Sequence, residues 1–401
     1  MNIPFSPPDI SELEINEVVE TLKSGWITTG PRTKLFEKMI ADYCGTPRAV
    51  GVSSCTAGLE LVLRYYGVGP GDEVIVPAYT YTATASVVHH VGAKIVMCDV
   101  KKDKFHIDYK EIEKKITPRT KAVIPVDIGG VIINYKKIFK ILEKKRDLFI
   151  PENEVQKKIG RVLVLSDCAH SFGAVRDEKK AGAHADFSVF SFHAVKNLTT
   201  AEGGAITWIS HEGIDDEELY HWFMLYSLHG QSKDAFSKMQ LGAWEYDIVY
   251  PAYKCNMTDI TAAIGIIQLK RFDGLMQKRR EIVKAYDEDL LPLGIKRLNH
   301  FPDCGQGNGH LYLMRIPGIS EQERNEIIVK LAEAGIASNV HYKPLPMHTA
   351  YKNLGFDIKD YPNSYAQYCN EITLPLHTLL VKDELQYILD NMKCILSNRE
   401  S

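Results

Sequence analysis

Seven short apolar runs, most of them separated by segments of helical length or period, constrain the fold more than any other feature of the sequence. A strand that is apolar throughout has both faces covered, as strands do in parallel sheets with helices on both sides. Alternation of such strands with helices is typical of α/β proteins. We therefore predict an α/β fold with a mainly parallel seven-stranded sheet. The runs are AVGVSS, EVIVPA, KIVMCDV, KAVIPVD, RVLVLSD, FSVFSF and GAITWI.

The chain of 401 residues is long enough to form two domains. A long helical pattern, residues 258–291, follows the last apolar run and leads to a C-terminal part with fewer strand candidates. We predict a large α/β domain at residues 1–270 and a smaller α+β domain at residues 271–401. The large domain begins with a helix and loop at residues 1–35, where Ser11 and Glu14 form a capping box.

Composition excludes several classes of function. The net charge of −3 argues against a protein whose main task is to bind nucleic acid. No apolar run reaches the roughly 18 residues that a membrane span needs, and the N-terminal sequence lacks the pattern of a signal peptide. The eight cysteines are scattered and form no CxxC pair, so we predict neither a metal site nor disulfides. These features favour a cytoplasmic protein.

Reactive side chains follow the predicted strands at the point where each strand ends, which is where open α/β sheets bind ligands. Asp167 ends one strand, and Ser191 ends another that leads to Lys196 in SFHAVKNLTTAEGG. Tyr81 follows a third strand. Cys55 opens a helix directly after a fourth, and the start of a helix offers free backbone N–H groups.

An amine, a carboxylate, an aromatic ring and an anion-binding helix start at one edge of a sheet point to pyridoxal phosphate (PLP). A lysine amine forms a Schiff base with the aldehyde of this cofactor. A carboxylate keeps the pyridine nitrogen protonated, so that the ring can accept electrons. The helix start and a serine hydroxyl can hold the phosphate, and the aromatic ring can stack on the pyridine.

These residues lie in motifs that resemble those of the DegT/DnrJ/EryC1/StrS aminotransferases, a family with the type I fold of PLP-dependent transferases. The resemblance extends over nearly the whole chain, and the segment around Lys196 is its most specific part. It implies a PLP-dependent transaminase in which Lys196 is the Schiff-base lysine. The matching motifs are LKSGWITTGPRTKLFE, VSSCTAGLEL, GDEVIVPAYTYTATA, SDCAHSFGA, FSFHAVKNLTTAEGG, YDIVYPAYKCNMTDITAAIG, HYKPLP and EITLPLH.

The resemblance also implies roles for other residues. Asp167 would pair with the pyridine nitrogen, His170 would lie beside the ring or its hydroxyl, and Tyr81 would stack on it. The phosphate would be bound by Ser191 together with the start of the helix at Cys55, Thr56 and Ala57. The substrate would meet Trp26, Thr28, Thr29 and His341. The sequence departs from the family pattern at Ser166, where the family has glutamate, and at Lys233, where arginine is common.

The family builds each active site from two subunits, so the resemblance predicts a homodimer. A residue of YKCNMTD, either Lys254 or Asn256, would reach the phosphate in the neighbouring subunit. The next run, ITAAIGIIQL, is more apolar than a solvated helix, and we expect it to be buried at this contact.

Most members of the family aminate nucleotide-linked keto sugars. The resemblance therefore implies transfer of an amino group from an amino-acid donor, glutamate, to such a sugar in amino-sugar or polysaccharide biosynthesis. An aminotransferase for cyclitol ketones is an alternative, because the difference lies in the shape of the pocket. A sugar dehydratase of the same family would carry histidine in place of Lys196. A non-catalytic regulator would not need the full set of cofactor residues.

Overall fold

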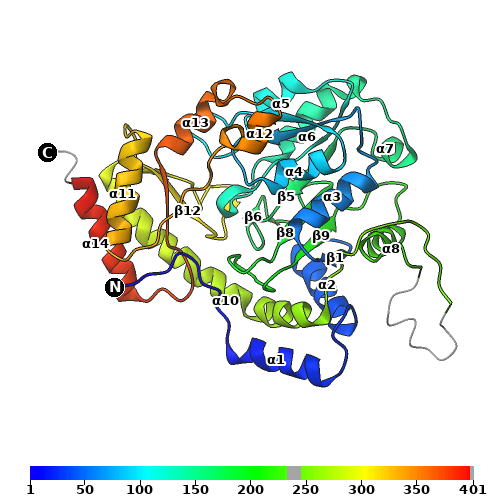
Figure 1. The fold of residues 1–401 in the computed structure, drawn as a ribbon, viewed down its shortest axis with the longest axis horizontal. Coiled ribbons are helices and arrows are strands. Elements are labelled where there is room, and N and C mark those ends of the chain that lie inside the picture. The colour runs from blue at the N-terminus through cyan, green and yellow to red at the C-terminus, as the bar shows by residue number, and fades with distance from the viewer. Residues whose placement is uncertain (233–244, 398–401) are drawn as a thin grey trace.

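The computed structural model describes residues 1–232 and 245–397, and its centre is a seven-stranded sheet (Figure 1). The strand order is β1-β9-β8-β5-β4-β2-β3. Strand β9 runs antiparallel to both of its neighbours, and every other pair is parallel. The predicted mainly parallel seven-stranded sheet is therefore confirmed. Its strands are β1 (Ala49–Val52), β2 (Glu73–Pro77), β3 (Lys94–Cys98), β4 (Thr120–Val123), β5 (Leu163–Asp167), β8 (Phe187–Ser191) and β9 (Gly204–Trp208).

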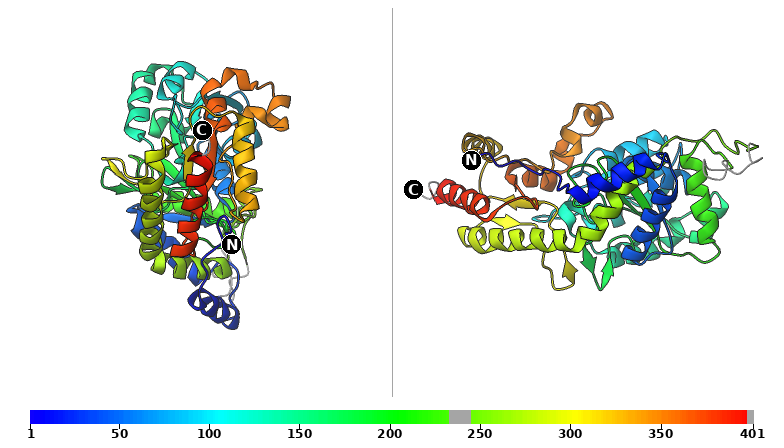
Figure 2. Two further views of the ribbon diagram at one scale, coloured as in Figure 1. Left: turned by 90° about the vertical axis from the view of Figure 1, so that its left-hand side faces the viewer. Right: turned by 90° about the horizontal axis from the view of Figure 1, so that it is seen from below.

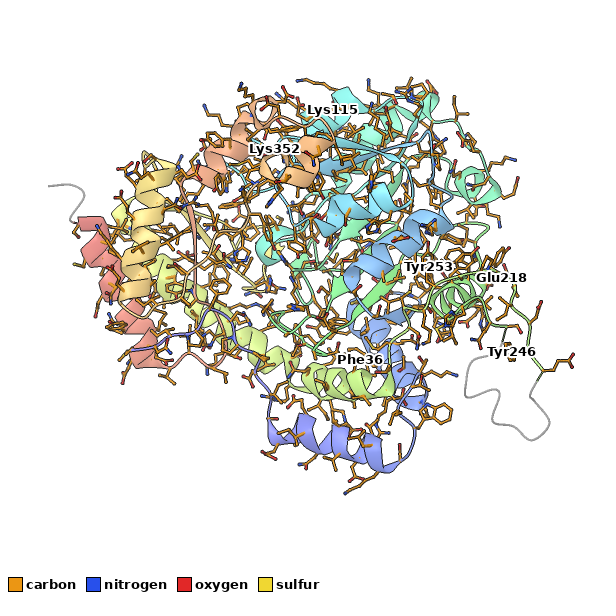
Figure 3. The ribbon with its side chains drawn as sticks, viewed as in Figure 1. Phe36, Lys115, Glu218, Tyr246, Tyr253 and Lys352 are labelled. Carbon is orange, nitrogen blue, oxygen red and sulfur yellow. The ribbon has the colours of Figure 1, made fainter. Side chains whose placement is uncertain are left out.

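Helices cover both faces of the sheet, which explains why its strands are apolar throughout. One face packs on α2 (Pro31–Cys44), α5 (Tyr109–Lys115), α6 (Tyr135–Lys144) and the first half of α10 (Asp259–Leu290). The other face packs on α3 (Cys55–Tyr65), α4 (Ala83–His90), α7 (Glu154–Ile159) and α8 (Asp216–Ser227). In Figure 3 the labelled Phe36 of α2 lies beside α10, where a Cβ at Gly265 would be 2.4 Å from its ring.

The N-terminal helix α1 (Glu12–Lys23) lies on the outside of α10 (Figure 2). The predicted capping box of Ser11 and Glu14 is present at its start. Glu14 also accepts hydrogen bonds from Gln268 and Arg271 of α10, which fasten the helix to the large domain. Helix α1 also carries exposed apolar side chains, which include Leu13, Ile15 and Leu22.

The C-terminal part has its own apolar core, around a small antiparallel sheet of order β10-β12-β13. Its elements are β10 (Lys296–Arg297), β12 (Tyr312–Arg315), α11 (Glu321–Glu333), α12 (Thr349–Asn353), α13 (Pro362–Cys369), β13 (Glu371–Leu374) and α14 (Lys382–Ser397). A third sheet joins β11 (Gly305–Gln306) to β6 (Val175–Arg176) and β7 (Lys179–Lys180). Helix α10 continues through residue 270 from one core to the other, and the division of the chain at this residue stays a prediction.

The expectation for the run ITAAIGIIQL is wrong. Ala262, Ala263 and Ile266 are buried inside their own chain, because this part of α10 packs under the large sheet. The run is apolar for the sake of the core, so it gives no support to a subunit contact. Lys233 lies outside the described residues. In the part of the chain that the structure describes, none of the helices combines the length and the apolar character required to cross a membrane.

Candidate active site

A cavity of about 490 Å³ lies at the carboxyl ends of β5 and β8 and contains most of the predicted site residues. Its floor comes from the large sheet, and the turn at His341 and Tyr342 of the C-terminal part forms another wall. The lining residues that the sequence predicts are Cys55, Thr56, Tyr81, Asp167, His170, Ser191, Lys196 and His341. The structure thus brings together segments that are far apart in the chain.

Lys196 lies in the loop between β8 and β9, and its backbone N–H donates to the carbonyl of His193 at 2.9 Å. Burial lowers the pKa of the Lys196 amine to about 8, although Cys55 and Asp167 act in the opposite direction. Within the described residues the amine has no hydrogen-bond partner, since none of the contacts of the loop involves its Nζ atom. A lysine in this state is a nucleophile near neutral pH.

This pKa gives a prediction for the apoenzyme. Only the neutral amine attacks an aldehyde, so the rate of covalent PLP binding should rise with pH and level off above a midpoint of about 8. An ordinary lysine would give a midpoint near 10.5. Stopped-flow absorbance of apoenzyme mixed with PLP measures this rate. A midpoint near the ordinary lysine value would contradict the assignment, and a Lys330→Ala variant at an exposed site serves as the control.

Asp167 ends β5, and its carboxylate is held on both oxygens. Oδ2 accepts a hydrogen bond of 2.7 Å from the Thr84 hydroxyl, and Oδ1 accepts one of 3.1 Å from the backbone N–H of Ala169. The Cys55 thiol lies 3.8 Å from Oδ1. Burial raises the pKa of the Asp167 carboxyl, and these hydrogen bonds act against that rise. A buried carboxylate with a fixed direction suits a partner that brings a positive charge.

His170 has a defined tautomer. Its Nδ1 accepts a hydrogen bond of 3.1 Å from the backbone N–H of Gly129, so the hydrogen of the neutral ring is on Nε2. Burial, with Lys196 and His341 nearby, lowers the pKa of His170 well below its usual range. Nε2 therefore donates to the hydroxyl of Tyr342, 3.0 Å away. The hydrogen of the Tyr342 hydroxyl is then left for a ligand in the cavity.

The start of α3 fits an anionic group. The Ser54 hydroxyl caps the helix and accepts from the N–H of Ala57, so that N–H is already occupied. In the described structure the N–H groups of Cys55 and Thr56 have no protein partner, and both residues line the cavity. Gly204 allows β9 to approach closely, since a Cβ there would lie 2.7 Å from the backbone nitrogen of Cys55. Ser191 adds a hydroxyl at the same side.

Several predicted residues do not line the cavity of this subunit. Asn256 is buried and donates to the Thr29 hydroxyl and the Met257 carbonyl, while Lys254 is exposed and bonds to the Asn256 side chain. Thr28 holds the start of α10 through its carbonyl. The remaining predicted substrate residue, Trp26, is half-buried against the backbone of Gly30. Their roles in binding phosphate and substrate stay predictions.

The sequence analysis missed several lining or supporting residues, among them Thr84, Ser54 and Tyr342. Thr84 lies in the first turn of α4, and its contact with Asp167 depends on how α4 packs against β5. Ser54 could have been found, because a serine directly before a helix is a common N-cap. Tyr342 follows His341 in the sequence, but only the tertiary structure places it on His170.

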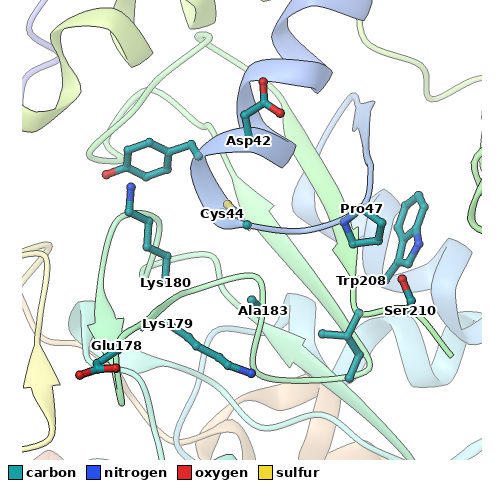
Figure 4. A pocket seen from close by; sticks show the side chains of 12 residues that line it. Asp42, Cys44, Pro47, Glu178, Lys179, Lys180, Ala183, Trp208 and Ser210 are labelled. Atoms are coloured by element: carbon teal, nitrogen blue, oxygen red, sulfur yellow. The ribbon is translucent and has the colours of Figure 1, made fainter.

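A second cavity of about 490 Å³ lies at the C-terminal end of α2 (Figure 4). It is lined by polar and charged side chains, among them Asp42, Lys179 and Lys180, and the Lys180 amine lies 3.3 Å from the centre of the Tyr43 ring. None of the predicted site residues lines it.

A lysine with a lowered pKa, a buried carboxylate and a free helix start at the carboxyl ends of parallel strands together define a site for PLP. When bound, this cofactor supplies an aldehyde for the lysine and a ring that accepts electrons. The sequence model of the DegT/DnrJ/EryC1/StrS aminotransferase family matches residues 8–393. The chain belongs to this family and is a PLP-dependent transaminase.

Relatives of known sequence and structure agree with this result. The spore coat polysaccharide biosynthesis protein SpsC of Bacillus subtilis is 36% identical, and the alignment covers 99% of this chain and 98% of SpsC. Spr1654 of Streptococcus pneumoniae, assigned as a sugar aminotransferase, is 55% identical in its PMP form, with a TM-score of 0.97 over 99% of this chain and 100% of that one. Its PLP form gives a TM-score of 0.96 at 53% identity, over 99% of each chain.

Proposed function

We propose that this protein is a sugar aminotransferase, which moves an amino group from glutamate to the keto group of a nucleotide-linked sugar. The observation that carries the proposal is the cavity at Lys196, where the reactive amine lies next to a wall of hydrogen-bonding side chains. Thr80, His193, Glu202, His341 and Tyr342 provide this wall. Such a lining suits a ligand with many hydroxyl groups better than an apolar ketone.

The relatives support the same class of substrate. SpsC is named for polysaccharide biosynthesis, and Spr1654 is assigned as a sugar aminotransferase. PseC of Helicobacter pylori, described as an aminotransferase of pseudoaminic acid biosynthesis, is 28% identical with a TM-score of 0.87, over 99% of this chain and 100% of that one. We propose that the reaction takes place in the cytoplasm, where the enzyme would encounter nucleotide-linked sugars.

A panel of keto sugar nucleotides, offered to the holoenzyme with glutamate, tests the proposal. We expect one or more members to accept the amino group with formation of 2-oxoglutarate, which a coupled dehydrogenase assay measures. Cyclitol ketones belong in the same panel, because they are the substrates of the alternative function. Turnover of cyclitol ketones without turnover of any sugar nucleotide would replace the proposal by that alternative.

We also propose that the protein acts as a homodimer with shared active sites. Exposed apolar side chains lie on α1 and at residues 246–253, where Figure 3 labels Tyr246 and Tyr253. An apolar groove lies between α1 and the loop of Lys196, and its lining includes Ile15, Val19 and Ala194. A second copy of the chain would cover these side chains.

A complementation experiment tests the shared site. A Lys196→Ala variant and a Lys254→Ala/Asn256→Ala double variant should each be inactive, and subunit exchange between them should restore activity. Each mixed dimer then has one site with both the lysine and the partner residues. Turnover after mixing, together with native mass spectrometry of the dimers, measures this recovery. Mixed dimers that stay inactive would place these two residues in their own subunit's site or in no site.

A further inference from the structure

His341 belongs to the C-terminal part and lines the cavity. One of its ring nitrogens is hydrogen-bonded to the protein. Its Nδ1 is 2.9 Å from the hydroxyl of Thr373, and its ring stacks on Phe5 with a centroid distance of 5.6 Å. Among the described residues Nε2 has no hydrogen-bond partner. The imidazole therefore has a fixed orientation, and Nε2 is the nitrogen that remains for a ligand.

Glu371 holds the same histidine by two routes. Its Oε2 accepts a hydrogen bond of 2.8 Å from the backbone N–H of His341, and its Oε1 lies 2.6 Å from the hydroxyl of Thr373. Glu371 and Thr373 are both in β13, two residues apart, so their side chains project from the same face of the strand. On the opposite side, the Tyr79 hydroxyl donates to the carbonyl of His341 at 2.8 Å.

The hydrogen bonds that link Glu371, Thr373 and His341 all run in one direction, because the Thr373 hydroxyl has a single hydrogen and can donate to only one of its two neighbours. If the Glu371 carboxyl is protonated, it donates to Thr373, which donates to Nδ1, and the ring hydrogen is on Nε2. If the carboxylate is ionised, it accepts from Thr373, and the ring hydrogen moves to Nδ1. Burial, with Lys196 nearby, lowers the pKa of His341 to about 3, so the ring is neutral in both cases.

Charged and ionisable groups surround Glu371 from several elements. Burial raises its pKa to about 8, while Thr373, the backbone of His341 and the Arg324 guanidinium of α11 act against that rise. Arg315 of β12 is the cross-strand partner of Glu371, but its guanidinium binds the side chains of Asn370 and Asp103. The raised pKa favours the protonated carboxyl at pH 7, and a protonated Glu371 corresponds to a hydrogen on Nε2 of His341.

The hydroxyls of Tyr79 and Tyr342 also lie within the electrostatic reach of the Glu371 carboxyl. Burial raises the pKa of both tyrosines well above the usual range, so neither changes its charge near pH 8. Of Glu371 and the two tyrosines, Glu371 is thus the group that changes its charge near pH 8; the Lys196 amine has a similar pKa when it is free of cofactor, so the Glu371→Gln variant is needed to separate the two.

We propose that Thr373 and Glu371 are positioning residues that set the tautomer of His341, so that its Nε2–H donates a hydrogen bond to an oxygen atom of the amino-acceptor substrate. The proposal rests on the proposed function for the identity of that substrate, whose keto and hydroxyl oxygens can accept such a bond. A rise of pH above about 8 ionises Glu371 and reverses the direction of its hydrogen bonds with Thr373 and His341. The hydrogen of the ring is then on Nδ1, so Nε2 can no longer donate to the substrate.

The test combines three variants. Thr373→Val keeps the shape but removes the hydroxyl, and it should raise the KM of the acceptor about 3- to 10-fold with kcat within about twofold. Thr373→Ser should restore the wild-type KM. In Glu371→Gln the amide oxygen faces the backbone N–H of His341, so the amide NH₂ faces Thr373 and imitates the protonated carboxyl. This variant should therefore lose the rise of KM that the wild type shows above about pH 8.

The tautomer itself is measured by ¹⁵N NMR of holoenzyme labelled at histidine, with the signal of His341 assigned from its loss in His341→Gln. We expect the hydrogen on Nε2 at pH 7 and on Nδ1 at about pH 9.5 in the wild type, and on Nε2 at both in Glu371→Gln. An exposed Thr349→Val variant is the matched control. A wild-type tautomer and KM in Thr373→Val would overturn the proposal, as would an unchanged pH dependence in Glu371→Gln.

This readout separates the two hypotheses. If the wild type aminates no keto sugar, the proposed function fails, but the NMR signal still reports whether Thr373 and Glu371 set the tautomer. If sugars are aminated and the tautomer of His341 does not respond to either residue, the proposed function stands and this inference fails.

Discussion

A Lys196→Ala variant should fold normally, bind PLP without a covalent bond and lose transamination by at least about 10²–10⁴-fold, the range for removal of an acid/base group alone. The amine is the group of the cavity whose pKa is lowered to about 8, and it makes no hydrogen bond to the part of the chain that the structure describes. Removal of the amine should therefore lower the rate of transamination and leave the melting temperature nearly unchanged. Borohydride reduction followed by peptide mapping measures the covalent bond, and a thermal melt measures stability.

The exposed Lys330→Ala variant provides the control for this experiment, since it removes the same charge from α11 far from the cavity. It should keep both the reduced adduct and the activity. A Lys196→Ala protein that still forms a borohydride-trapped adduct would show that another lysine holds the cofactor.

An Asp167→Asn variant should retain bound cofactor but lose roughly a hundredfold or more in kcat, the range for loss of one preorganised electrostatic contact. The carboxylate is held by Thr84 and the N–H of Ala169, so its charge is directed at a fixed point in the cavity. An amide in the same place has no negative charge to keep the pyridine nitrogen protonated, which weakens the ring as an electron acceptor.

Single-turnover absorbance with glutamate measures this loss separately from substrate release, and the absorbance of the bound cofactor confirms its retention. The Thr84→Val variant, which removes one hydrogen bond but keeps the charge, gives a matched comparison and should lose much less activity. A near-normal kcat in Asp167→Asn would exclude the proposed role of this carboxylate.

The sheet and the positions of Asp167, Ser191 and Lys196 could be predicted because they depend on local patterns. Continuous apolar runs show where the strands lie, and strand ends in such sheets meet at one edge. The Ser11 capping box was also predictable from its spacing. In each case a short stretch of sequence contains the whole physical reason for the structure.

Other features depend on packing between distant segments, which a single sequence does not reveal. The apolar run after residue 259 is equally consistent with a subunit contact and with a buried helix, and only the position of α10 under the sheet decides for the core. The contacts of Thr84 with Asp167 and of Tyr342 with His170 join elements that are 83 and 172 residues apart. Whether Lys254 and Asn256 serve a neighbouring subunit depends on a second chain.

The cavity is solvent-accessible on the side of Tyr81 and Val195, which are 61% and 39% exposed, whereas Asp167 at the other end is 4% exposed. Because Asp167 at the closed end would be met by the cofactor, we expect a substrate to lie on the open side, with its reacting carbon toward Lys196 and any bulky group at the exposed rim. We expect selection by shape to be strict at the reacting end and weak at the outer one. Such an enzyme would tolerate variation in the outer group, so the evolution of new substrates would be easier there than at the reacting end.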